Sequence, residues 1–203
     1  GKSNKEAFNK GLYHLNFIVG LWNFYNNNVS IFSKDTLGIN KVYSINNIVL
    51  YPFCFLFNLS TKSFEEQFYY EKCYIDKKKF NIGAEYWNKL RNYEKNIRRK
   101  LFKSQLHNFL YTAIIRYNNI FDDNNLDTVF IKLWSLLEYL TSTGKQDGYG
   151  TTIKRTAILY DDYENTKIIL EYIKNQRNEY VHRNDELPDV ERDVFILKRF
   201  VER

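Results

Sequence analysis

The chain has 203 residues, a net charge of +6, 44% hydrophobic residues and 27% charged residues. This composition is close to the average of globular domains and excludes a largely disordered chain. Two prolines and eight glycines are too few for an all-β sandwich with many tight turns. The longest apolar run, residues 48–57, contains Pro52. It is shorter than the roughly 20 residues that a membrane-spanning helix needs, so no membrane partner is expected.

The cysteines and histidines give no sign of a metal site or a disulfide scaffold. Cys54 and Cys73 are the only cysteines, so a reducing, cytoplasmic location is expected, although one disulfide between them stays open. His14, His107 and His182 lie far apart in the sequence, so no zinc site is expected. The chain starts with glycine and contains no methionine, which leaves open that it is a piece of a longer protein.

The first 81 residues are predicted to hold one helix and a few short strands. Apolar residues at helical spacing predict a helix over residues 5–25, which three asparagines at 26–28 are expected to end. Aromatic and β-branched runs then predict two or three strands, at residues 42–43, 48–57 and 68–75. Pro52 is expected to place its strand at a sheet edge or a bulge.

From residue 82 to residue 203 the sequence predicts a second, almost entirely helical domain, so the fold class is mainly α. The predicted helices cover residues 87–101, 106–117, 126–141, 152–160 and 165–183, with a last helix after Pro188. Ser104 is expected to cap or kink the first of them. The glycine-rich stretch 144–150 departs from the phosphate-binding loop pattern at two positions, so we interpret it as a flexible connector.

Basic residues concentrate between residues 77 and 103. They are Lys77, Lys78, Lys79, Lys89, Arg91, Lys95, Arg98, Arg99, Lys100 and Lys103. Only Glu85 and Glu94 oppose them, so this window carries +8 and the rest of the chain −2. Such a surface attracts polyanions, whereas the alternative is an ordinary solvated helix face.

The helix predicted over 165–183 carries an unusual charge pattern. At 100° per residue, Arg177 falls in the apolar stripe around Ile173, whereas Asn178 and His182 lie together on the opposite face. An arginine in an apolar stripe needs a partner, because burying its charge unpaired is costly. The alternatives are that Arg177 extends to the surface or pairs with a carboxylate, and that His182 is an ordinary helix-terminal histidine.

The run Arg177-Asn178-x-x-x-His182 resembles the R-x4–6-H signature of the HEPN superfamily. Residues 133–140, which carry Glu138 after aromatic and aliphatic residues, are similar to the earlier helix of ApeA-like HEPN domains. The resemblance covers roughly residues 104–203 and implies a HEPN-like helical bundle in the C-terminal half. The N-terminal half resembles no family that we can name.

HEPN domains with this motif are typically dimeric, metal-independent endoribonucleases, so the resemblance implies RNA cleavage without a cofactor. The RNA 2′-hydroxyl would attack the adjacent phosphate, leaving a 2′,3′-cyclic phosphate and a 5′-hydroxyl. His182 would be the general base or acid, and Arg177 would stabilise charge on the phosphate. Asn178 would orient His182 or bind a phosphate oxygen, and Glu138 would be the carboxylate partner of Arg177.

The expected partners follow from the same resemblance and from the basic window. RNA, with tRNA as one candidate, would be bound through its backbone by Arg91, Lys95, Arg98, Arg99 and Lys103. A homodimer would bring two copies of the 165–183 helix together across a two-fold axis, so that they line a shared cleft. A regulatory partner or a missing domain stays open.

The implied role is antiphage defence, abortive infection or toxicity. Position 184 is Asn, whereas one toxin branch has a modifiable tyrosine there, which argues against that regulation. Two other functions stay open. One is a non-catalytic HEPN module for dimerisation or for nucleotide or RNA binding, and the other is a helical interaction domain with a basic face.

Overall fold

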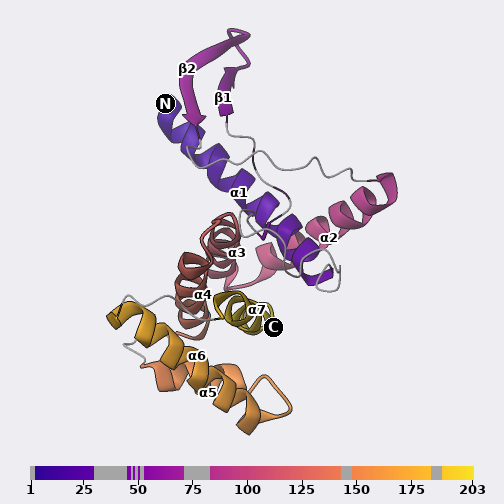
Figure 1. The fold of residues 1–203 in the computed structure, drawn as a ribbon. Coiled ribbons are helices and arrows are strands. Elements are labelled where there is room, and N and C mark those ends of the chain that lie inside the picture. Colours follow the sequence, from indigo (N-terminus) through magenta and orange to yellow (C-terminus); the bar gives the residue numbers. More distant parts are fainter. Residues whose placement is uncertain are drawn as a thin grey trace. The chain divides into compact units, whose positions relative to one another are not determined.

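The computed structural model describes residues 3–29, 45–46, 48, 50, 53–70, 83–142, 148–183 and 189–203. Within these ranges the chain forms seven helices and one two-stranded sheet (Figure 1). The fold is therefore mainly α, as the sequence predicts. The chain divides into two compact units, Gly1–Asn118 and Asn119–Arg203, and each is described by itself below.

The division does not coincide with the domain boundary predicted at residues 81 and 82. The reason lies in α2 (Ala84–Lys103), which packs on α1 (Asn4–Val29) within the first unit. Aromatic pairs hold the two helices together. The Trp22 and Trp87 rings meet edge to face at 5.2 Å, and the Tyr25 and Tyr93 ring centres lie 4.8 Å apart.

Helix α1 continues through the asparagines that were predicted to end it. Asparagine usually ends helices because its amide bonds to the nearby backbone. Here the Tyr86 hydroxyl donates to Asn26 Oδ1 at 2.6 Å, and Asn27 Nδ2 donates to the Tyr117 hydroxyl at 3.1 Å. Tertiary partners occupy these amides, so the helix extends to Val29.

Three buried asparagines connect α1, α3 (His107–Phe121) and the segment around residue 46. Asn23 Nδ2 donates to Asn118 Oδ1 and to the Ile48 carbonyl, both at 2.7 Å. The Ile48 N–H donates back to Asn23 Oδ1 at 3.1 Å, and Asn46 Nδ2 donates to the Asn118 carbonyl at 2.8 Å. We call Asn23, Asn46 and Asn118 the asparagine cluster. All three are at most 1% exposed, so hydrogen bonds must replace the water that burial removed.

An apolar cluster lies beside the asparagine cluster between α1 and α3. The Phe17 and Tyr111 rings stack with 3.8 Å between their centres, and Leu21 and Ile115 complete the buried group. The two helices come close at Gly20, where a Cβ would lie 2.9 Å from the backbone oxygen of residue 114. A larger residue there would push the helices apart.

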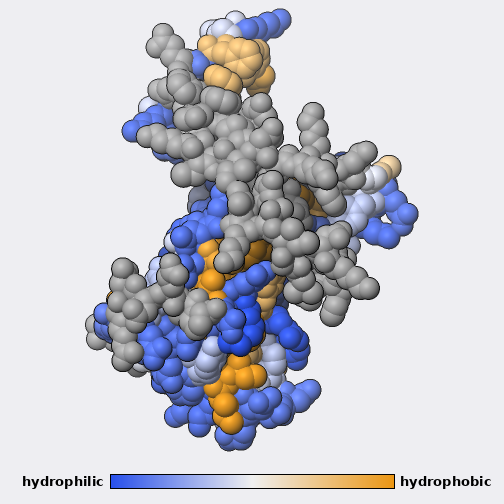
Figure 2. Space-filling model, viewed as in Figure 1, coloured by the Kyte–Doolittle hydropathy of each residue, from blue (hydrophilic) through white to orange (hydrophobic). Residues whose placement is uncertain are grey.

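The sheet is a hairpin of β1 (Phe53–Asn58) and β2 (Ser63–Tyr70), paired antiparallel with an irregular register between residues 55 and 57. Both strands are displaced from the predicted ranges, and the strand predicted at 42–43 lies outside the described residues. Asn58 starts the turn by accepting from the backbone N–H of residue 60 at 3.0 Å. Hydrophobic side chains gather on this hairpin (Figure 2). The exposed ones are Phe55, Phe57, Leu59 and Phe64.

The break predicted at Ser104 is confirmed. Helix α2 ends at Lys103, and Ser104 has extended backbone angles. The Ser104 hydroxyl then accepts from the Leu106 N–H at 3.1 Å. Leu106 was expected in the apolar stripe of the next helix. It lies before the first residue of α3 and is 60% exposed.

The second unit contains α4 (Leu126–Thr141), α5 (Tyr149–Ala157), α6 (Tyr163–Arg183) and α7 (Val190–Val201). Helix α4 contacts the other three. Its buried residues are Val129, Phe130, Leu133, Trp134, Leu136 and Leu137. Its bounds are those predicted, because the Asn125 side chain caps its first turn through the Thr128 N–H at 2.8 Å. Helix α5 begins three residues before its predicted start at 152.

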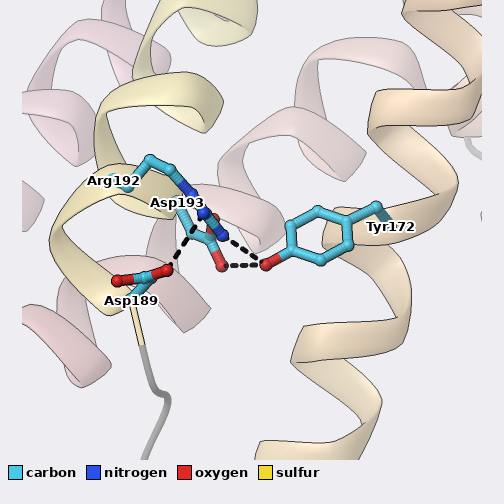
Figure 3. A network of polar contacts seen from close by, with 4 residues as sticks. All are labelled: Tyr172, Asp189, Arg192 and Asp193. Carbon is cyan, nitrogen blue, oxygen red and sulfur yellow. Dashed lines mark hydrogen bonds and ion pairs between the residues drawn. The ribbon is translucent and has the colours of Figure 1, made fainter.

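A buried carboxylate joins α6 to α7 (Figure 3). Asp193 is fully buried. It accepts from the Tyr172 hydroxyl and from Arg192 Nε, both at 3.2 Å. Arg192 also donates to the Tyr172 hydroxyl at 2.6 Å and pairs with Asp189 at 3.0 Å. Burial raises the pKa of Tyr172, and the nearby Asp193 carboxylate raises this pKa further.

Replacing Asn23 with Ala should destabilise the first unit. The change removes a donor to Asn118 and both side-chain partners of the Ile48 backbone, so the free energy of unfolding should fall by about 2–3 kcal/mol. Urea-induced unfolding measures it. Asn28→Ala is the control, because Asn28 is exposed and should change the stability by less than about 0.5 kcal/mol. Equal stability of the two variants would contradict a structural role for the asparagine cluster.

Replacing Tyr172 with Phe should lower the stability of the second unit by about 1 kcal/mol, because a donor to the buried Asp193 is lost. The effect depends on pH. Folding raises the pKa of Tyr172, so the stability it contributes is present below its unfolded pKa of about 10 and falls at higher pH. The difference between wild type and Tyr172→Phe in urea unfolding should therefore shrink above pH 10. Tyr163→Phe is the control, since the Tyr163 hydroxyl has no hydrogen-bond partner among the described residues.

Candidate functional site

Arg177 lies on the inner side of α6, in line with residues of the core. Thr166, Leu170 and Ile173 precede it at helical spacing and are at most 6% exposed. Arg177 itself is half-buried, as the predicted apolar stripe requires. Val181 was expected in the same stripe but is 47% exposed, so the fully buried part of the stripe ends before the last turns of α6.

The Arg177 guanidinium is held by neutral groups. Its Nη1 donates to the Tyr149 hydroxyl at 2.9 Å and to Asn178 Oδ1 at 3.2 Å, and its central carbon lies 5.3 Å from the centre of the Tyr149 ring. Its Nε is buried without a hydrogen-bond partner. Across the ranges that the structure describes, no carboxylate pairs with it. Arg177 is therefore a positive charge held by neutral groups, which suits an anion such as a phosphate.

Tyr149 is the site residue that the sequence did not reveal. It is the first residue of α5, whereas the sequence placed it in the glycine-rich connector. Its ring lies edge to face against Trp134 of α4, with 6.0 Å between the ring centres, and its hydroxyl accepts from Arg177. The available signal was an aromatic residue between two glycines, Gly148 and Gly150, shortly before the helix predicted from residue 152.

Glu138 approaches the site through other side chains. Its Oε1 accepts from Trp134 Nε1 at 2.9 Å, and Trp134 in turn contacts Tyr149. The direct pair of Glu138 with Arg177 that the sequence suggested is absent from the described contacts within one chain. The Trp134 indole, buried one turn earlier on α4, needs an acceptor, and the Glu138 carboxylate supplies it. The place of Glu138 in the catalytic set stays a prediction.

Asn178 and His182 share one face of α6 but make no hydrogen bond to each other in the described part of the chain. Asn178 was expected to orient His182, but its Oδ1 accepts from Arg177 instead. His182 is exposed in the last turn of α6, and none of the described side chains hydrogen-bonds to it. One chain therefore joins Arg177 to Asn178 and Tyr149 by hydrogen bonds, whereas His182 lies about 140° from Arg177 around the helix.

The predicted RNA-binding residues all lie on α2, in the first unit. They differ in whether a carboxylate lies beside them. Arg98 pairs with Glu94 at 3.1 Å, and the Glu94 side chain is only 9% exposed. The other four residues, Arg91, Lys95, Arg99 and Lys103, are exposed. They have no carboxylate partner within the described part of the chain. Among the described residues, Arg99 donates to the amide oxygen of Asn96, at 3.2 Å.

Neither a membrane-spanning helix nor a metal site is found in the ranges that the structure describes. No described helix combines the length and the apolar character needed to cross a membrane. No group of three or more His, Cys, Asp or Glu side chains among the described residues could hold a metal ion.

No family model, curated protein or solved structure matches this chain. The resemblance to HEPN domains therefore stays a hypothesis.

Replacing Tyr149 with Phe should loosen Arg177 while keeping the ring contact with Trp134. The variant loses the acceptor for Arg177 Nη1, so the free energy of unfolding should fall by about 1–2 kcal/mol. A double-mutant cycle with Arg177→Met isolates this hydrogen bond and should give a coupling energy of at least about 0.5 kcal/mol. Additive effects of the two changes would show that Tyr149 does not hold Arg177.

Proposed function

We propose that the chain is a metal-independent endoribonuclease that uses Arg177 and His182 of α6. The supporting observation is the state of Arg177, which is half-buried, has a buried Nε without a partner and has no carboxylate beside it in the described part of the chain. A cation held by neutral groups can stabilise charge that develops on a phosphate in a transition state. The spacing of Arg177 and His182 and the resemblance to HEPN domains supply the reaction class.

In this mechanism the RNA 2′-hydroxyl attacks the adjacent phosphorus and the bond to the 5′-oxygen breaks. His182 would accept the 2′-hydroxyl proton or donate a proton to the leaving oxygen, since imidazole titrates near neutral pH. Arg177 would donate to the non-bridging oxygens of the phosphate. Metal independence, a role in antiphage defence or toxicity, and a tRNA target depend on the resemblance. A cytoplasmic location depends on the low cysteine content. All of these form part of the proposal.

A dimer belongs to this proposal because one α6 helix presents Arg177 and His182 about 140° apart around its axis. Two copies of α6 related by a two-fold axis would combine Arg177 of one chain with His182 of the other in a shared cleft. The outer face of α6 supports this arrangement. Ile168 is 67% exposed and lies on the same face of α6 as His182, about 21 Å from it along the helix axis, so this face offers an apolar contact to a second copy.

A second candidate is a non-catalytic HEPN module that binds nucleotide or RNA. The observation that favours it is the separation within one chain, where Arg177 contacts Tyr149 and Asn178 while His182 stands apart. Such a module would bind RNA through Arg177 without cleaving it.

Replacing His182 with Ala should reduce RNA cleavage by about 10²–10⁴-fold, which is the usual contribution of general acid–base catalysis. Stability should change little, because the side chain is exposed. The assay is cleavage of end-labelled RNA in EDTA, with a 2′-deoxy strand expected to stay intact. Asn165→Ala, an exposed change near the start of the same helix, should cleave like wild type. Wild-type cleavage by His182→Ala, or a requirement for a divalent metal, would overturn the proposal.

The shared cleft can be tested by mixing two inactive variants. Arg177→Ala and His182→Ala proteins should each be inactive, whereas a mixed dimer would contain one cleft with both residues intact. Partial recovery of cleavage after mixing supports the shared cleft. No recovery, with mixed dimers confirmed by mass, would contradict it.

A further inference from the structure

Helix α2 carries an exposed aromatic ring on the same face as basic residues that pair with no described carboxylate. Phe102 is 62% exposed, and its ring lies 5.9 Å from the ring of His107, the first residue of α3. Around the helix axis, Phe102 falls about 20° from Arg91 and from Lys95, and about 60° from Arg99. We call Arg91, Lys95, Arg99 and Phe102 the α2 face.

The cations of the α2 face are available to an outside anion. Lys89 pairs with Glu85 at 2.8 Å and Arg98 pairs with Glu94 at 3.1 Å, so these two charges are opposed. Arg91, Lys95 and Arg99 have no opposing carboxylate among the described residues. At 1.5 Å per residue, Arg91 and Phe102 are separated by about 16 Å along α2, which is long enough for several backbone phosphates.

We propose that the α2 face binds single-stranded nucleic acid, with phosphates on Arg91, Lys95 and Arg99 and one base stacked on Phe102. A row of cations beside an exposed aromatic ring is the combination that binds single strands, because every base has a face that can stack. In a duplex the bases are stacked on each other and cannot reach a phenyl ring. The ring therefore favours a single strand over a duplex or a polyanion without bases.

This inference deepens the proposed function by naming the form of RNA that the chain would receive. It does not depend on cleavage, because binding can be measured with a 2′-deoxy strand that the proposed mechanism leaves intact. Loss of binding and loss of cleavage can therefore be told apart.

The test measures fluorescence anisotropy of a labelled 2′-deoxy oligonucleotide and of a duplex of the same length, using the full chain. Phe102→Ala should weaken single-strand binding about tenfold and leave duplex binding unchanged. Phe102→Trp should restore it, whereas Phe102→Leu, which keeps apolar bulk without an aromatic face, should not. Phe64→Ala is the aromatic control, since Phe64 is 71% exposed on the hairpin.

Two adjacent arginines provide a matched pair for the charge contribution. Arg99→Gln should weaken binding and lower the slope of log affinity against log salt by about 0.7, as expected for one lost phosphate contact on a single strand. Arg98→Gln should change the affinity and the salt slope much less, because the Glu94 carboxylate already pairs with Arg98.

Two results would overturn the proposal. One is wild-type single-strand affinity in Phe102→Ala. The other is equal binding of inorganic polyphosphate and the oligonucleotide with no dependence on Phe102, which would reduce the α2 face to a general polyanion surface. Circular dichroism and thermal unfolding should show that each variant is folded.

Discussion

The burial of Trp134 is the constraint on which the second unit and its candidate site depend. The indole is completely buried in α4, and an indole N–H in the core must find an acceptor. Glu138, one turn later, supplies the acceptor at 2.9 Å. The fixed indole then supports the Tyr149 ring, and the Tyr149 hydroxyl holds Arg177. The position of the candidate phosphate-binding group therefore follows from the packing of one aromatic side chain in the central helix.

The first unit has a different kind of core, in which amides join the elements. Asn23, Asn46 and Asn118 bond to each other and to the Ile48 backbone. A buried polar network is stable only when its members are satisfied, and it then allows few alternative arrangements. The network therefore fixes the positions of α1, α3 and the segment around residue 46 relative to each other, in addition to the stabilisation from the apolar cluster.

In both units, some basic side chains pair with a buried carboxylate, and others pair with none among the described residues. The candidate binding groups belong to the second set. Arg98 and Arg192 pair with carboxylates that are almost fully buried, so these two arginines neutralise buried charges and stabilise the fold. Arg177 and the cations of the α2 face have no such partner in the described part of the chain. Because a fold gains little from leaving arginine uncompensated, these are the positions where a phosphate would add most.

The sequence by itself determined the elements whose signal is local. Helical periodicity gave the bounds of α4, Ser104 marked the end of α2, and the apolar stripe of α6 contained Arg177. Only the tertiary structure decided that α1 continues past its asparagines, that Arg98 rather than Arg99 is compensated, and that Glu138 holds Trp134 instead of Arg177. The physical reason is the same in each case. A side-chain amide, guanidinium or carboxylate has several energetically similar partners, and the choice among them depends on which groups the packing of helices brings within hydrogen-bonding distance.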